Sequence, residues 1–260
     1  MQERSILTIA SLVLNAGLLL VFGLYAYKTR QVLIGWFNYF ANRQPNGESP
    51  FYRQRMQAFR KLKDSGVNKP VVVFMGDSMV HTYEWAEHFR GLDGVEIINR
   101  GINGDNVAGV AARAESDLEK FADIEKLLLM VGVNDIGTKR SFSALQFLSR
   151  FETLLDNVSK RVPAGRVYVH SLLPVLNRPN VSNDDIVVAN RHLRQLCEKL
   201  GVNFVDLHSR FMTAEGKVNG RYLHSDGLHL SAEGYGEWIS VIEPIVRGSA
   251  RAEKRSAVSV

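Results

Sequence analysis

Short apolar runs alternate with amphipathic stretches through most of the chain. The run at 71–75 is continuous and apolar, which is typical of a strand buried in a parallel sheet. Further strands are expected at 95–98, 126–131, 166–170 and 202–205, and helices near 80–90, 106–121, 141–161, 183–200 and 231–247. Strands that alternate with helices form a parallel sheet with helices on both faces. The pattern therefore predicts an α/β domain over residues 71–247, with about five parallel strands.

The beginning of the chain has a different pattern. Residues 5–27 form an uncharged, mostly apolar run of about 23 residues. A helix of that length can cross a hydrocarbon core of about 30 Å. A cleaved signal peptide needs a shorter apolar region and small residues before the cleavage point, and residues 24–26 fit that pattern poorly. We therefore expect residues 1–27 to be an uncleaved transmembrane helix that anchors the protein in a membrane.

Basic residues crowd the segment between the expected anchor and the domain. The net charge is +5 and the sequence pI is about 9.3. Residues 28–70 read as a basic juxtamembrane connector that lies near anionic lipid. No basic motif with interleaved aromatic residues is present, so nucleic acid is not an expected partner. Within this connector, Ser49 followed by Pro50 predicts the start of a helix.

Two smaller features change the picture little. Cys197 is the one cysteine, which excludes an intrachain disulfide and a cysteine-based zinc site. It falls within an expected helix, and we interpret it as a small buried side chain. The polar segment 248–260 is expected to be a flexible tail.

Four polar, glycine-rich segments fall at the ends of expected strands or in the equivalent loop. In open parallel sheets, ligands bind beyond the carboxyl ends of the strands. The segments are 76–78 (GDS), 99–104 (NRGING), 132–135 (GVND) and 224–229 (HSDGLH). We therefore expect them to meet at one rim of the sheet.

Taken in order, these segments resemble the motif blocks of the SGNH, or GDSL-type, hydrolase family. Each motif alone is short enough to arise by chance, whereas four in the same order are specific. The sequence departs from the family name at Met79, where the motif has leucine, and this swap conserves volume and apolarity. The resemblance covers roughly residues 71–247 and implies a flavodoxin-like three-layer α/β/α fold. It also implies a serine esterase that needs no cofactor and no metal.

The resemblance assigns the nucleophile to Ser78, supported by Asp226 and His229. A serine hydroxyl is a poor nucleophile until an adjacent base removes its proton, and His229 is the candidate base. Asp226 would hold the imidazole in the required tautomer, and its spacing from His229 allows one loop to present both. The resemblance further assigns the oxyanion hole to the backbone N–H groups of Ser78 and Gly104 and the side-chain amide of Asn134.

Simpler interpretations of the same residues stay open. Ser78 is also a suitable helix N-cap, and Gly104 and Asn134 are common turn residues. His224, Asp226 and His229 could belong to a metal site, although such a site needs further ligands that the sequence does not show.

The resemblance does not fix the substrate or the cellular location. The expected substrate is a lipid, short-chain acyl or O-acetyl ester. The alternatives are a carbohydrate O-acetylesterase or O-acyltransferase on the same scaffold, and a catalytically silent binding module tethered to the membrane. Arg4 precedes the apolar run while Lys28 and Arg30 follow it, so charge does not decide the orientation of the anchor. By analogy with anchored hydrolases of this type, we expect the domain to be extracytoplasmic.

Overall fold

The structure is a computed structural model that describes residues 29, 50–61, 69–137 and 142–256. The transmembrane helix expected at 1–27 lies outside these residues, so it and its orientation stay predictions. None of the helices in the described ranges combines the length and the apolarity that a membrane span requires.

Five parallel strands form the sheet in the order β2-β1-β3-β4-β5. The strands are β1 (Val71–Gly76), β2 (Glu96–Gly101), β3 (Ile124–Met130), β4 (Val167–His170) and β5 (Asn203–Val205). This is the flavodoxin-like order, in which the chain reverses direction across the sheet between β1 and β3. Ligands bind at such a reversal, and β1 ends directly before Asp77 and Ser78.

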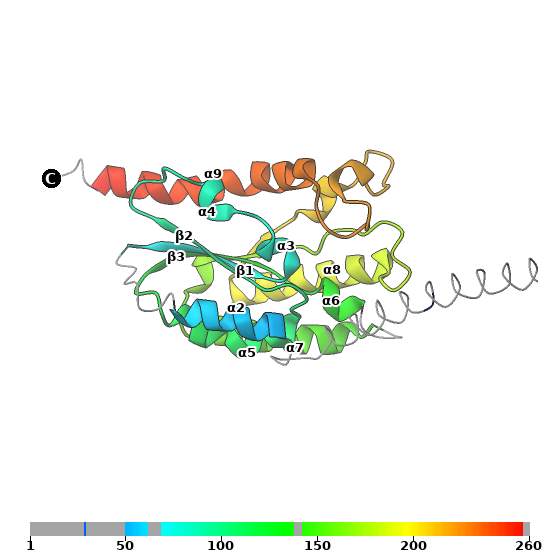
Figure 1. The fold of residues 1–260 in the computed structure, drawn as a ribbon, viewed down its shortest axis with the longest axis horizontal. Helices are drawn as coiled ribbons and strands as arrows, with labels where there is room; N and C mark the ends of the chain where they lie inside the picture. Colours follow the sequence, from blue (N-terminus) through cyan, green and yellow to red (C-terminus); the bar gives the residue numbers. More distant parts are fainter. Residues whose placement is uncertain (1–28, 30–49, 62–68, 138–141, 257–260) are drawn as a thin grey trace, which may run out of the picture. The chain divides into compact units, whose positions relative to one another are not determined.

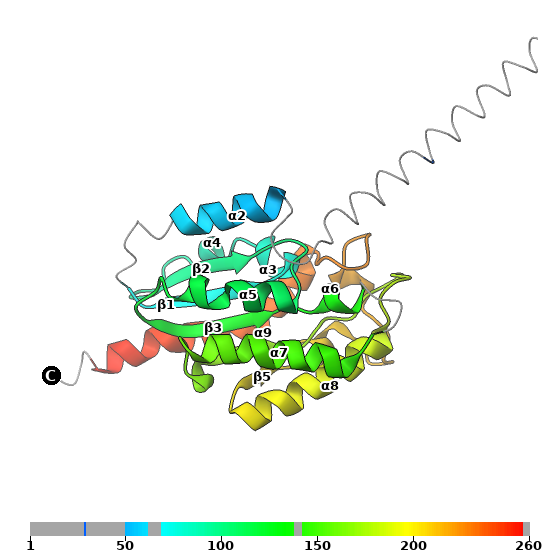
Figure 2. The same ribbon diagram turned by 90° about the horizontal axis from the view of Figure 1, so that it is seen from below.

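Helices cover both faces of the sheet, which confirms the predicted three-layer architecture. Helices α5 (Val107–Leu118), α7 (Ala144–Ser159) and α8 (Asn183–Leu200) lie on one face, with α4 (Trp85–His88) and α9 (Ala232–Ser256) on the other (Figures 1 and 2). The remaining elements are α2 (Pro50–Lys61), α3 (Ser78–His81), α6 (Val133–Ile136), η2 (Ala164–Arg166), η3 (His208–Phe211) and η4 (Gly220–Tyr222).

Two expected helices differ in the structure. The single helix expected at 80–90 is instead the two short helices α3 and α4. The carbonyl of Val80 accepts hydrogen bonds from the side chains of Asn99 and Trp85, at 3.0 and 2.8 Å. A carbonyl held by side chains is not available to the next helical turn, so the helix is interrupted. At the other end of the chain, α9 continues to Ser256 rather than ending near residue 247.

Contacts between aromatic side chains attach α4 and α9 to β1. All six residues of β1 are buried. The ring of Phe74 lies 4.2 Å from that of Trp85, which in turn lies 5.0 Å from the ring of Trp238. Because aromatic rings bury large areas in fixed geometries, this cluster holds β1 firmly between its neighbours. The strand that precedes Ser78 is therefore a rigid support.

Helix α2 begins at Pro50 as expected and lies beside the β2 edge, on the same side of the sheet as α5 (Figures 1 and 2). The guanidinium of Arg100 packs over the rings of Phe59 and Phe121, at 4.5 and 5.2 Å. Burial lowers the pKa of Arg100 to about 10. The cation–π contact with Phe59 attaches α2 to the carboxyl end of β2.

The last residue of β4, His170, is fully buried. Its Nδ1 lies 3.2 Å from the carbonyl oxygen of Leu129, and within the described residues its Nε2 has no hydrogen-bond partner. Burial lowers the pKa of His170 from 6.5 to about 4. The imidazole is therefore neutral in the folded protein at neutral pH.

We predict that His170 makes the fold sensitive to acid. As the pH falls from about 6.5 to about 4, the unfolded chain binds a proton that the folded chain does not, so stability is lost in that window. The loss amounts to about 3 kcal/mol. Between neutral pH and pH 4, the free energy of unfolding measured with urea should therefore fall by this amount more in the wild type than in His170→Phe. Parallel pH profiles would show that His170 is not responsible.

Candidate active site

Ser78 lies at the carboxyl end of β1, as the sequence predicts. It is the first residue of α3 and is 7% exposed. The preceding residue, Asp77, caps this helix through a 3.0 Å hydrogen bond from the main-chain N–H of Met79. Burial raises the pKa of the Asp77 carboxyl to about 7, against the opposing effect of hydrogen bonds from the backbone of Met79 and Gly132. The turn that presents Ser78 is thus fixed from inside the protein.

Asp226 and His229 lie in a narrow loop before α9. An antiparallel bridge between Leu223 and Leu230 closes the base of this loop. The main-chain N–H of His224 also donates to the carbonyl of His229 at 2.8 Å. The loop therefore holds the side chains of Asp226 and His229 on a short, closed support.

The structure joins the three predicted catalytic residues in one hydrogen-bonded line. His229 Nε2 lies 3.0 Å from Ser78 Oγ, and His229 Nδ1 lies 2.5 Å from Asp226 Oδ2. The other carboxylate oxygen, Asp226 Oδ1, accepts from the main-chain N–H groups of Leu228 and His229, each at 3.0 Å. The carboxylate is therefore locked in the orientation that faces the imidazole.

The charge on Asp226 decides which nitrogen of His229 carries the proton. Partial burial raises the pKa of Asp226, but hydrogen bonds from the Leu228 backbone and from His229 outweigh this effect and lower it to about 2. The carboxylate is thus ionised at neutral pH and accepts from Nδ1–H. In the neutral imidazole, Nε2 then carries the lone pair that faces Ser78 Oγ. This arrangement can withdraw the proton from the serine hydroxyl.

The two other predicted oxyanion residues lie in adjoining segments. Gly104 is in the turn after β2 with a φ of +75°, a left-handed conformation that favours glycine. Asn134 is in α6, and its Nδ2 donates to the carbonyl of Asp105 at 2.8 Å. This bond places the amide beside the residue that follows Gly104. An amide group has two N–H bonds, so one remains for a ligand.

A buried ion-pair network, not predicted from the sequence, supports these segments. Arg113 of α5 donates to Asp105 at 2.9 Å, to Asp117 at 2.8 Å and to the carbonyl of Gly76 at 3.1 Å. All three charged side chains are nearly inaccessible to solvent. One guanidinium therefore links the turn after Gly104 to the end of β1. The sequence signal for this network is the presence of Arg113 and Asp117 on the otherwise apolar face of the helix predicted at 106–121.

Further contacts fix the surrounding elements. Asp135 accepts from the main-chain N–H of Val107 at 2.9 Å, at the start of α5. The hydroxyl of Tyr235 donates to the carbonyl of Met79 at 2.9 Å, which ties α9 to α3.

The metal site considered for the segment 224–229 included His224, whose side chain is exposed. Among the described residues, no three His, Cys, Asp or Glu side chains are placed to bind a metal ion.

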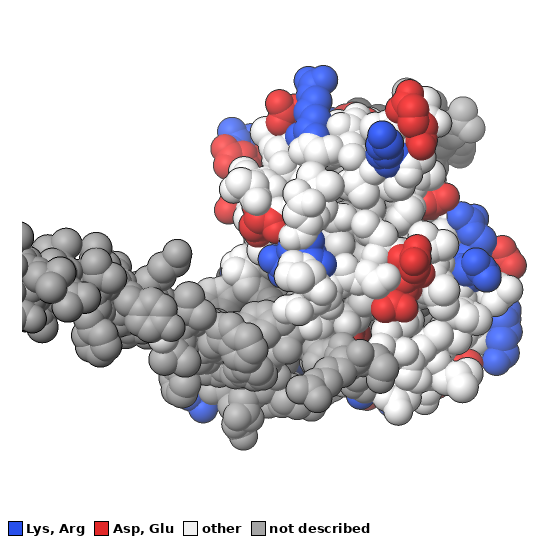
Figure 3. Space-filling view, turned by 90° about the vertical axis from the view of Figure 1, so that its right-hand side faces the viewer, with Lys and Arg blue, Asp and Glu red and all other residues white. Residues whose placement is uncertain are grey.

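Figure 3 looks onto the molecule from the side toward which the carboxyl ends of the strands point. Lys and Arg side chains are scattered over this face among Asp and Glu.

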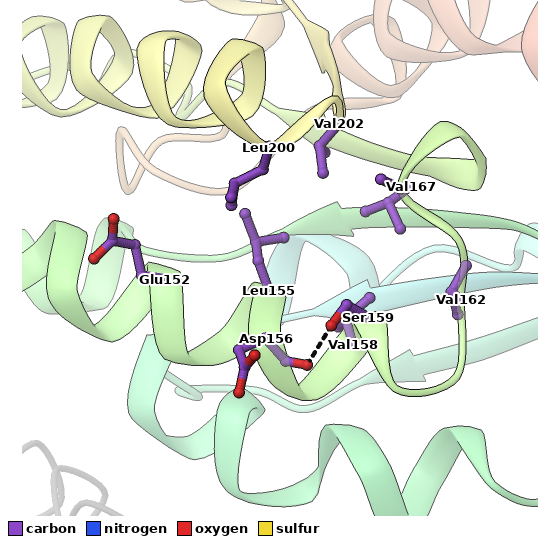
Figure 4. A pocket seen from close by; sticks show the side chains of 10 residues that line it. Glu152, Leu155, Asp156, Val158, Ser159, Val162, Val167, Leu200 and Val202 are labelled. Atoms are coloured by element: carbon purple, nitrogen blue, oxygen red, sulfur yellow. Dashed lines mark hydrogen bonds between the residues drawn. The ribbon is translucent and has the colours of Figure 1, made fainter.

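A cavity of about 300 Å³ lies elsewhere, between α7 and the end of α8 (Figure 4). Val167 and Val202 line it, and they stand at the amino ends of β4 and β5. This apolar cavity is therefore at the opposite end of the sheet from Ser78.

Comparison with known proteins identifies the family. The sequence model of the GDSL-like Lipase/Acylhydrolase family matches residues 74–236, which include all four motif segments. The protein belongs to this family. The GDSL-like assignment confirms the resemblance seen in the sequence and establishes the protein as a hydrolase that acts on esters.

Individual relatives of this GDSL-like hydrolase support the family assignment. Platelet-activating factor acetylhydrolase IB subunit alpha1 from Homo sapiens is 30% identical over 178 residues, covering 68% of this chain and 75% of the relative. A solved Streptococcus pneumonia structure, whose name refers to platelet activating factor, matches with a TM-score of 0.64 and 25% identity. That match covers 84% of this chain and 98% of the other. A GDSL-like lipase from Bacteroides thetaiotaomicron shares the fold, with a TM-score of 0.63, 18% identity, and coverage of 74% and 97%.

We predict that Gly227 is required to seat the loop that carries Asp226 and His229. A Cβ atom at this position would lie 1.7 Å from the carbonyl oxygen of Leu176, and the φ of Gly227 is +68°. Gly227→Ala must therefore displace the loop, and a shift of about 1 Å at catalytic groups typically costs about 100-fold in rate. The measurement is kcat/KM on 4-nitrophenyl acetate, with circular dichroism to show that the variant is folded.

Gly216 provides the matched control. Its φ is +72°, but no atom lies within 4 Å of a Cβ built there. Gly216→Ala therefore carries the same backbone strain without the clash, and it should retain activity close to that of the wild type. Equal losses in the two variants would mean that backbone strain, rather than loop displacement, is responsible.

Proposed function

We propose that the protein is a serine esterase that forms an acyl-enzyme on Ser78. The observation that carries this proposal is the line of hydrogen bonds from Ser78 Oγ through His229 to Asp226. Ser78 Oγ attacks the ester carbonyl while His229 Nε2 removes its proton. His229 then donates that proton to the departing alcohol, which leaves the acyl group bound to Ser78.

The second half of the reaction reverses these roles. A water molecule replaces the alcohol, and His229 removes a proton from it as it attacks the acyl-enzyme. The carboxylic acid is released and the hydroxyl of Ser78 is restored. Throughout, Asp226 stabilises the imidazolium and keeps Nδ1 protonated, a role that its low pKa supports.

The tetrahedral intermediate carries a negative charge on the former carbonyl oxygen. We assign its stabilisation to the backbone N–H groups of Ser78 and Gly104 and to the amide of Asn134. The hydrogen bond from Asn134 to Asp105 supports this assignment, because it fixes the amide before the charge develops. Donors held in place in this way need no reorganisation during the reaction.

For the substrate we propose an ester with an acetyl or other short acyl group. The support is the relative at 30% identity, whose name describes an acetylhydrolase. The same acyl-enzyme could pass its acyl group to a sugar hydroxyl, and analysis of the products would separate hydrolysis from transfer.

Replacement of single residues tests the proposed mechanism. Ser78→Ala should lower kcat on 4-nitrophenyl acetate by about 10⁴-fold or more, because the nucleophile is lost. Asn134→Ala should lower kcat by about 10²–10³-fold, because one oxyanion donor is removed.

Ser240→Ala is the matched control for Ser78→Ala. The hydroxyl of Ser240 in α9 donates to a carbonyl at an exposed site, so this variant should keep full activity. A Ser78→Ala variant as active as the wild type would refute the mechanism.

A further inference from the structure

The loop between β4 and α8 forms one wall of the active-site rim. It follows the carboxyl end of β4, and the main-chain N–H of Leu176 donates to the carbonyl of Gly227 at 2.8 Å. Further along, the side chain of Val181 packs closely against Gly137, which ends α6. The loop therefore extends from the segment that carries His229 to the helix that carries Asn134.

This loop is held in one conformation by its own hydrogen bonds. The side chain of Asn183 both donates to and accepts from the main chain of Val175, each at 2.9 Å. The N–H of Val181 donates to the carbonyl of Arg178 at 3.2 Å. These hydrogen bonds therefore close the segment from Val175 to Asn183 into a fixed frame.

A shallow cavity of about 440 Å³, widely open to solvent, lies against this frame. The residues that line it are Val175, Asn177, Arg178, Pro179, Val181 and Asn183. Asn177 has a φ of +54° and is the one non-glycine residue with positive φ in the described part of the chain. Asparagine tolerates this left-handed conformation better than other non-glycine residues. Here it turns the chain directly before Arg178.

Arg178 is half-buried, yet its guanidinium makes no hydrogen bond or ion pair with any described residue. No acidic residue lines the cavity. Asp184 and Asp185 lie in the first turn of α8, but neither carboxylate forms an ion pair with Arg178. The guanidinium therefore offers its N–H donors to whatever enters the cavity.

We propose that Arg178 forms a subsite for a negatively charged group on the ester substrate. A guanidinium binds carboxylate and phosphate through paired, charge-assisted hydrogen bonds, so the substrate would carry one of these two anions away from the ester bond. The inference rests on the proposed esterase function, since it adds a specificity residue to the same site. Arg178 would raise kcat/KM for anionic esters and leave neutral esters unaffected.

The experiment compares esters that differ in charge. The neutral substrate is methyl 4-acetoxybenzoate, and the anionic ones are 4-acetoxybenzoate and 4-acetoxyphenyl phosphate. Arg178→Gln should lower kcat/KM for an anionic ester by about 10- to 100-fold, the usual value of a charge-assisted hydrogen bond. For the neutral ester it should change kcat/KM less than about twofold. The anion that shows the larger loss is the one that the subsite prefers.

Two further variants control for charge and geometry. Arg161→Gln makes the same change in net charge at an exposed ion pair with Glu119, beyond the end of α7, and should affect no substrate. Arg178→Lys keeps the charge but loses the paired donors, so it should recover part of the activity on anionic esters.

Equal losses on neutral and anionic esters, or no loss on either, would overturn the subsite. Failure of the esterase mechanism itself would look different, because hydrolysis of the neutral ester would then survive Ser78→Ala.

Discussion

The hydrogen bond between His229 Nε2 and Ser78 Oγ is the contact on which the chemistry depends. It joins the end of β1 to a loop near the end of the domain, 151 residues further along the chain. The ionised Asp226 gives this contact its direction, because it fixes the proton on Nδ1 and leaves Nε2 to face the serine. A surface loop and a buried turn thus become one reactive unit.

The surrounding protein holds both partners of this contact from several sides. Arg113 bonds to the end of β1 and to the turn after Gly104, while Tyr235 fixes the backbone of α3. Burying an ion pair carries a desolvation cost that is offset only when each charge is well bonded, as Arg113 is here. Its value to the protein is the fixed spacing that it imposes on the nucleophile and the oxyanion turn. That spacing is what electrostatic stabilisation of a transition state requires.

Much of the fold and the centre of the site could be predicted because local sequence determines them. Strands buried on both faces appear as continuous apolar runs, and the polar loops that follow them must meet at one edge of a parallel sheet. Contacts between distant segments could not be predicted in this way. The helix expected at 80–90 is interrupted by Asn99, which comes from the neighbouring strand. Arg113 and Arg178 likewise acquire their roles only from what the folded chain places around them.

The central claim is that one serine has been made nucleophilic by its contact with His229, and covalent labelling tests this most directly. A fluorophosphonate probe reacts only with an activated serine hydroxyl. After labelling of the full chain, digestion and mass spectrometry should find the probe on the peptide that contains Ser78, and His229→Ala should abolish the label. Modification of a different residue, or labelling of Ser78 that persists without the imidazole, would contradict the account.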